Sequence, residues 1–322
     1  MAILHATLHQ LKIFDAVARH MSFARAAEEL YLTPPALSIQ VKQLAEIIGQ
    51  PLFEQIGKKI SLTAAGEISW ATCQDVLNRL EQLTQELAAL QGLEKGTLKL
   101  ATLDTVKYFL PRLLGDFCTK HPGIDTVLFI GNRESLLERL ARNQDDLYFL
   151  GQPPEHMNVM AEPFADNLLV VVASPNHPLA KETDIVPSRL KDVPFILREA
   201  GSGTRLAAEK FFEQHGVVLK ARMEVGSNEA VKQVVAGGLG VAVLSASTLR
   251  SELASGELVI LDIHGLPLKR KWHVVYPMGK QLAPASKAFM EYLRDVAHLL
   301  DHQQSNAVAI SAGRKKGHPP EG

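Results

Sequence analysis

A chain of 322 residues that is 46% hydrophobic and 21% charged, with a formal net charge of −1, has the composition of a soluble globular protein of two or three domains. The near-zero charge excludes a wholly basic nucleic-acid coat protein. Two distant cysteines imply no disulfide framework, and the longest apolar run, residues 168–173, is too short to cross a bilayer. Because the first residues also lack a secretory signal, we expect a cytoplasmic protein.

Residues 1–62 carry the pattern of a helix-turn-helix with a wing. An apolar repeat from residue 8 predicts a first helix, and Ser22 is placed to cap a second one over residues 23–30. After a short turn, Thr33 caps a third helix with Pro34 at its first position, where the missing N–H costs nothing. Two short strands, 51–55 and 60–63, complete the wing. This order predicts a DNA-reading domain, and an ordinary small helical domain is the alternative.

The third helix divides into a core face and a face for DNA. Leu37, Val41 and Leu44 repeat at helical spacing and are expected to point inward. The remaining face would enter the major groove, and two wing lysines would meet phosphate. The candidate DNA-binding residues are Thr33, Pro34, Pro35, Ser38, Ile39, Gln40, Lys42, Lys58 and Lys59. Acidic and basic residues are nearly balanced in this domain, so we expect modest affinity per head and several heads binding together.

Four segments together resemble the N-terminal signature of LysR-type transcriptional regulators. They read FARAAEEL at residues 23–30, TPPALS at 33–38, PLFE at 51–54 and LTAAG at 62–66. The resemblance extends to about His302 and is strongest to the branch that controls Calvin-cycle and inorganic-carbon genes. Pro34 stands where that family usually has glutamine, and Gln55 where many members have arginine. These departures weaken the carry-over of one base contact and remove one phosphate contact.

A linker over residues 63–92 shows a coiled-coil seam. Its apolar positions recur at alternating intervals of three and four, which indicates a helix that needs an apolar partner. Thr63 can cap its start and Gly92 can stop it. The candidate dimerisation residues are Cys73, Val76, Leu80, Leu83, Leu87 and Leu90. We expect a homodimer, with packing on the chain's own body as the alternative. The resemblance implies antiparallel pairing of these helices and, further, a homotetramer. A twofold dimer would require a DNA site of imperfect dyad symmetry, with half-sites about one helical turn apart.

From residue 93 to 302, strands alternate with helices, among them a longer buried strand over residues 167–173, which predicts parallel sheets covered on both faces. Two α/β lobes account for this length better than one sheet: lobe I over residues 93–163 and 268–302, and lobe II over residues 164–267. The chain would cross between them near Pro163 and Pro267. This layout resembles a periplasmic-binding-protein-like effector domain. The last residues, 303–322, are predicted to be a disordered tail.

A ligand in such a body would lie between the lobes, at the carboxyl ends of the strands. Residues 201–205 combine two glycines, two hydroxyls and a guanidinium at a helix start, which suits an anion; a flexible loop before a capped helix is the alternative. Arg198 and Asn228 have surface or capping roles as alternatives, and Asp104 would repel an anion unless Lys107 or Arg205 offset it. The candidate effector-binding residues are Thr102, Asp104, Thr105, Asn132, Arg198, Ser202, Gly203, Thr204, Arg205 and Asn228.

No catalytic constellation, nucleotide-binding loop or metal-ligand spacing is recognisable, so we expect neither an enzyme nor a metal or cofactor. The resemblance implies an anionic effector such as a sugar phosphate, phosphoglycolate, 2-oxoglutarate or NADPH. The expected partners are double-stranded promoter DNA, a second copy of the chain and, further, RNA polymerase. The rival functions are an enzyme with a fused DNA-binding head, a transport binding protein, and a LysR regulator of another pathway. Activation and repression both remain open.

Overall fold

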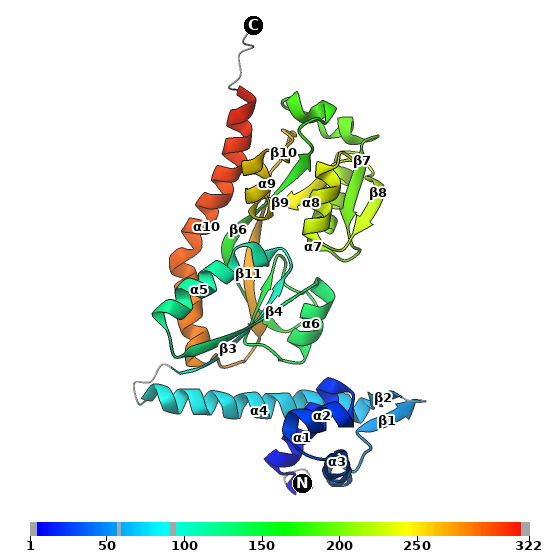
Figure 1. Ribbon diagram of the computed structural model, residues 1–322, viewed down its shortest axis with the longest axis vertical. Coiled ribbons are helices and arrows are strands. Elements are labelled where there is room, and N and C mark those ends of the chain that lie inside the picture. The colour runs from blue at the N-terminus through cyan, green and yellow to red at the C-terminus, as the bar shows by residue number, and fades with distance from the viewer. Residues whose placement is uncertain (1–4, 57–58, 91–94, 317–322) are drawn as a thin grey trace. The chain divides into compact units, whose positions relative to one another are not determined.

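The computed structural model describes residues 5–56, 59–90 and 95–316 (Figure 1). The chain divides into two units, one of residues 1–93 and one, apart from residues 142–144, of residues 94–322. Within the described ranges, no helix is long and apolar enough to cross a membrane.

The first unit is the predicted winged helix-turn-helix. Thr7 and Gln10 form a capping box at the first helix, and the Ser22 hydroxyl accepts a hydrogen bond from the backbone N–H of Arg25 at the second. Thr33 is the N-cap residue of the third helix as predicted, but its side chain makes no capping hydrogen bond there. The elements are α1 (Leu8–His20), α2 (Phe23–Leu30), α3 (Pro34–Ile48), β1 (Phe53–Ile56) and β2 (Lys59–Leu62).

Three helices and the wing share the core of this unit. Leu37, Val41 and Leu44, predicted to face inward, are all buried. Leu37 and Val41 pack with small residues of α2, which lets the two helices lie close, and Phe53 of β1 contacts the rings of Phe14 and Phe23 edge-on. The apolar spacing of α3 is therefore explained by packing, which leaves its other face free.

The linker is helix α4 (Ala64–Leu90), which belongs to the same unit. The Thr63 hydroxyl caps it by accepting from the Gly66 N–H at 2.9 Å. A Cβ at Gly66 would lie 2.0 Å from the carbonyl oxygen of Leu52, so only glycine lets helix and wing approach this closely. The predicted stop at Gly92 lies outside the described residues.

The strands of the second unit (Figure 1) are β3 (Gly96–Leu103), β4 (Ile124–Gly131), β5 (Leu147–Leu150), β6 (Val159–Ala173), β7 (Pro194–Arg198), β8 (Lys220–Val225), β9 (Ala242–Ser245), β10 (Val259–Ile260) and β11 (Leu268–Pro277). Seven of them form one sheet in the order β10-β6-β11-β5-β3-β4, with β9 paired to β6. β7 and β8 form a separate parallel pair.

The prediction of two parallel sheets is wrong in part, because β6 and β11 run antiparallel along each other and are shared by both lobes. Among the named strands of the described residues, parallel pairing joins β3 to β4, β3 to β5 and β7 to β8, and two isolated parallel bridges join Ile185 to Ile263 and Phe195 to Val241. β6 was expected to begin at residue 167, but it begins at Val159. Pro163 lies inside it, where the register shifts opposite Trp272 and His273, and such a bulge tolerates proline. The chain therefore crosses between the lobes within strands β6 and β11, and Pro267 directly precedes β11.

Each lobe has helices on both faces of its strands, as predicted. The helices are α5 (Leu110–Lys120), α6 (Arg133–Ala141), α7 (Gly203–Gln214), α8 (Asn228–Ala236), α9 (Arg250–Ser255) and α10 (Pro284–Lys316). In lobe I, α5 and α10 cover one face and α6 covers the other. In lobe II, α7 covers one face and α8 and α9 cover the other.

Helix α10 contacts both lobes (Figure 1) and extends into the segment that was predicted to be a disordered tail. It continues through residues 303–316, which were expected to be disordered. The segment has no glycine or proline before Gly313, so nothing in it stops a helix. The side chains of Asp301 and Gln304 accept hydrogen bonds from the backbone N–H groups of Asp166 and Leu168, at 2.6 and 3.1 Å. Residues 317–322 lie outside the described part.

Candidate DNA interface and effector site

The outward face of α3 exposes the side chains expected to read DNA. Thr33, Pro34, Pro35, Ser38, Ile39 and Lys42 are exposed and Gln40 is partly so. Ile39 leaves 56% of its surface exposed and supplies the apolar group on this face. Lys59 is exposed at the start of β2, whereas Lys58 lies outside the described residues. The face thus combines hydroxyl, amide, ammonium and apolar groups, as base-edge and backbone contacts require.

Tyr31 is a candidate that the sequence analysis missed. It ends α2 in the left-handed conformation, with φ of 55°, and its side chain is 95% exposed just before α3. A phenol hydroxyl is among the groups that donate to DNA phosphates in protein–DNA complexes. Its signal in the sequence is weak, because a tyrosine in a turn is common on protein surfaces.

The α4 seam is exposed from Val76 onward. Val76, Leu80, Leu83 and Leu87 are each at least 37% exposed. The prediction that Cys73 belongs to this seam is wrong. Cys73 is buried in the core of the first unit, where its Sγ donates to the Leu11 carbonyl. Burial raises the pKa of this thiol to about 12, so it stays protonated. Leu90 lies where side chains are not described.

A cleft lies in the second unit, with walls from both lobes. Most of the predicted effector residues line it. The full lining is Leu103, Asp104, Thr105, Gly131, Asn132, Arg133, Gly151, Gln152, Asn167, Leu169, Arg198, Glu199, Ser202, Gly203, Thr204, Arg270 and Trp272. As predicted, the ends of β3 and β4 and the start of α7 meet at one place.

Three predicted residues do not line the cleft. Thr102 is fully buried and donates to the carbonyl of its neighbour Leu103. Arg205 instead pairs with Glu209 at 2.8 Å and Glu224 at 2.6 Å, which ties α7 to β8. Asn228 does not line the cleft but hydrogen-bonds to three residues that do, Asp104, Thr105 and Arg198. The anion-binding role expected of Arg205 is therefore unsupported, because two carboxylates already neutralise it.

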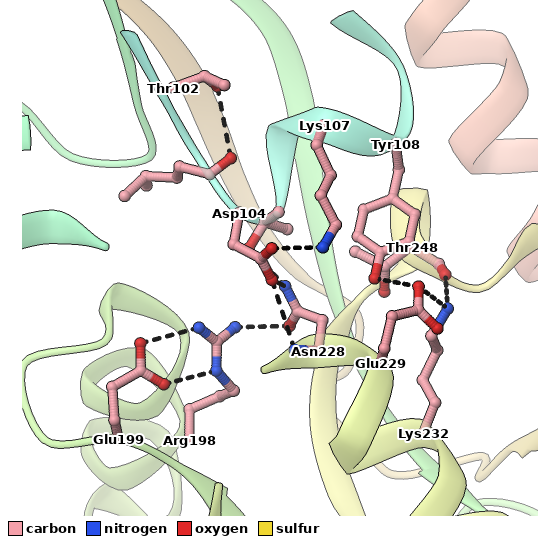
Figure 2. Close-up of polar contacts among 12 residues, drawn as sticks. Thr102, Asp104, Lys107, Tyr108, Arg198, Glu199, Asn228, Glu229, Lys232 and Thr248 are labelled. Carbon is pink, nitrogen blue, oxygen red and sulfur yellow. Dashed lines mark hydrogen bonds and ion pairs between the residues drawn. The ribbon is translucent and has the colours of Figure 1, made fainter. Parts of the chain in front are cut away.

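Asn228 joins the two lobes (Figure 2). Its side-chain amide donates to Asp104 Oδ2 at 2.9 Å and to Thr105 Oγ1 at 3.2 Å, while its Oδ1 accepts from Arg198 at 2.6 Å. Glu199 holds the same guanidinium with both carboxylate oxygens, at 2.7 and 2.8 Å. The charge of Arg198, which lines the cleft, is therefore already neutralised by Glu199.

Asp104 is ionised and locally compensated. Burial pushes its pKa up, but the Lys107 ammonium at 2.5 Å, the backbone N–H of Asn228 and the charge of Arg198 outweigh that effect and lower the pKa. Lys107 therefore supplies the offset that the sequence analysis required. An incoming anion meets a neutral pair here and not an isolated carboxylate.

A second contact between the lobes surrounds Lys232 (Figure 2). Tyr108, which follows β3, donates to Glu229 of α8 at 2.6 Å, and Lys232 pairs with Glu229 at 2.9 Å. Lys232 also pairs with Glu252 at 2.7 Å. Burial and Glu229 raise the pKa of the Tyr108 hydroxyl, so it remains a donor. Burial raises the pKa of Glu229, but Tyr108 and Lys232 together lower it. These bonds hold lobe I and lobe II in one closure.

Two pocket arginines were not predicted. Arg133 begins α6 and Arg270 lies on β11, and neither segment resembles an anion-binding loop in sequence. Gln152, Asn167 and Trp272 were also missed, since only the pairing of strands distant in sequence brings them to the cleft. Among the described residues, no group of three or more His, Cys, Asp or Glu side chains could hold a metal ion.

The comparisons with known proteins agree with this architecture. Residues 8–67 match the model of the bacterial regulatory helix-turn-helix protein of the lysR family, and residues 91–298 match the LysR substrate binding domain. A RuBisCO operon transcriptional regulator of Acidithiobacillus ferrooxidans is 78% identical over 293 residues, which cover 91% of this chain and 95% of that protein.

Two Synechocystis proteins are similar as well. The transcriptional activator CmpR is 50% identical over 289 residues, 90% of this chain and 95% of that protein. The solved regulatory domain of CcmR, in complex with 2-PG, superposes with a TM-score of 0.61 at 49% identity, covering 63% of this chain and 98% of that domain.

Proposed function

We propose that this chain, which belongs to the LysR family of bacterial transcriptional regulators, controls the transcription of carbon-fixation genes in response to a small anionic metabolite. It is a regulator and not an enzyme with a fused head. The observation that carries the proposal is the 78% identity, over nearly the whole chain, to a regulator of a RuBisCO operon. In this assignment residues 1–62 read DNA, residues 63–92 dimerise and residues 93–302 bind the effector.

The effector is a phosphorylated or dicarboxylic metabolite in the cleft between the lobes, with 2-phosphoglycolate the first candidate. A relative's regulatory domain carries this ligand at 49% identity. The first turn of α7 supports an anion here, because its amides at Gly203 and Thr204 begin a helix at the cleft and the Ser202 side chain does not cap them. Ser202, Thr204 and Thr105 add hydroxyl donors.

The response is a population shift between two closures of the lobes. The hydrogen bonds of Asn228 and Tyr108 between the lobes stabilise one closure without ligand, and an anion in the cleft stabilises a closure that fits it. An affinity difference of about tenfold between the two, roughly 1.4 kcal/mol, is enough to shift a near-balanced equilibrium. We infer that the shift reaches the heads of a cytoplasmic homodimer through α4.

Promoter binding by the purified full-length chain tests this function. We expect binding to DNA upstream of a RuBisCO operon at least about 10³-fold tighter than to an unrelated duplex. Adding 2-phosphoglycolate should change the affinity or the footprint. Fluorescence anisotropy and nuclease footprinting measure both. Equal affinity for promoter and unrelated duplex, with and without metabolites, would contradict the proposal.

Lys42→Ala should weaken binding to that promoter and flatten its salt dependence. Removal of one phosphate contact lowers the slope of log affinity against log salt by about one unit. Lys42 is exposed on α3, and Lys12, which is exposed on α1, serves as the matched control. Lys12→Ala should leave the slope unchanged. An unaltered slope in Lys42→Ala would rule out a phosphate contact for this lysine.

A further inference from the structure

We propose that Arg133 and Arg270 form a seat for a phosphate dianion at one end of the cleft, and that this pair selects phosphorylated effectors over otherwise similar carboxylates. The inference rests on the proposed function only in taking the cleft as the effector site. Neither arginine was selected by the sequence analysis, and neither belongs to the start of α7.

The other cations around the cleft already have carboxylate partners. Arg198 is held by both oxygens of Glu199, Lys107 pairs with Asp104, and Arg205 pairs with Glu209 and Glu224. An anion that approached any of these would have to displace a carboxylate. They shape the cleft but offer little net positive charge.

Arg133 and Arg270 differ from them because their hydrogen bonds end on neutral oxygens. Arg133 Nη1 donates to the Gln152 carbonyl at 2.7 Å. Arg270 Nη1 donates to the Gly203 carbonyl at 2.9 Å, and its Nη2 donates to Gln152 Oε1 at 3.0 Å. Within the part of the chain that the structure describes, neither guanidinium forms an ion pair with a carboxylate. Both are therefore oriented without being neutralised, and most of their N–H donors remain available.

The shared partner Gln152 brings the two positive charges together at the cleft wall. Burial lowers the pKa of both guanidiniums, and the charge of Arg133 lowers that of Arg270 further. Two neighbouring cations that are half removed from water and lack a counter-ion repel each other. A bound anion removes this repulsion, and an anion of higher charge removes more of it.

A phosphate monoester fits this pair better than a carboxylate. It carries a charge of about −1.5 to −2 at neutral pH and three acceptor oxygens, so it can meet two guanidinium forks at once. One carboxylate balances only one of the two cations. Arg270 also holds the Gly203 carbonyl at the start of α7, so a phosphate on Arg270 would bridge β11 and lobe II. The phosphate seat thereby couples ligand charge to closure of the cleft.

The test compares 2-phosphoglycolate with glycolate, which lacks only the phosphoryl group, by calorimetric titration of the full-length protein. We expect the wild type to bind 2-phosphoglycolate at least about 100-fold tighter than glycolate. Arg133→Gln and Arg270→Gln should each lower the affinity for 2-phosphoglycolate by about 10- to 100-fold, which is typical for losing a charge-assisted hydrogen bond. The affinity for glycolate should change much less. Arg270→Lys, which keeps the charge but not the planar fork, should lie between.

Arg189→Gln is the matched control, because Arg189 is exposed, forms an ion pair with Glu182 and does not line the cleft. Thermal unfolding and promoter binding without ligand must equal the wild type in every variant used. Wild-type affinity for 2-phosphoglycolate in both glutamine variants overturns the phosphate seat and leaves the proposed function intact. A wild type that binds neither compound, or both equally, also overturns it; promoter preference, measured separately, then decides the proposed function.

Discussion

Lys232→Met is expected to lower the free energy of unfolding of the second unit by about 3–5 kcal/mol. Lys232 is only 2% exposed and its ammonium lies between Glu252 and Glu229, so its loss leaves Glu252 as a buried charge without a cation. The other oxygen of Glu252, Oε2, already has no hydrogen-bond partner among the described residues. For a unit of this size the melting temperature should fall by roughly 6–20 °C.

Removing the carboxylate as well should restore most of that stability. In Lys232→Met/Glu252→Met no buried charge remains, and replacing both partners of a buried pair by apolar side chains is often neutral. Glu229 stays half exposed and solvated in either variant. Calorimetric unfolding of the single, double and Lys287→Met proteins, the last an exposed control on α10, measures the difference. A single variant within about 1 kcal/mol of wild type would show that the ion pair is not desolvated as the structure indicates.

The fold was most predictable where neighbours in sequence determine it. Caps, the first-position proline and a single apolar face specify α1 to α3, and each lies within a few residues of its prediction. β6 was predicted only from residue 167 because its first half carries Glu162, Pro163 and Asp166. What makes this half a strand is β11, about a hundred residues later, and such pairing leaves no local mark.

The residues of the candidate site were also predicted best where a local sequence signal marks them. Hydroxyls and glycines that follow a strand or open a helix were found at Thr105 and residues 202–204, because helix starts have their own sequence signals. Charge was predicted less well. Arg198 and Arg205 looked free for an anion, but their partners Glu199 and Glu224 neutralise them in the folded chain. Whether a guanidinium is free for a ligand depends on which carboxylates the fold brings near it, and a sequence pattern does not report that.

Leu80→Asp/Leu83→Asp is expected to convert the protein to a monomer and to lower promoter affinity by about 10²- to 10⁴-fold. Both leucines are exposed on α4 in the single chain, and Leu83 leaves 47% of its surface uncovered. In the proposed dimer each carboxylate would be buried against an apolar helix without a cation, at a cost that pairing cannot offset. A monomer also loses the effective concentration that links two heads, which accounts for the affinity loss.

Thr72→Asp provides the control, since Thr72 is exposed on the same helix one turn before the seam begins at Val76. It adds one carboxylate to the same helix, half the charge of the double variant, and should leave a dimer of wild-type affinity. Sedimentation velocity gives the mass, and fluorescence anisotropy on promoter DNA gives the affinity. If the seam instead packs on the chain's own body, the wild type will already sediment as a monomer. The aspartates will then lower its melting temperature without changing its mass, because they will charge an intramolecular contact and not one between two chains.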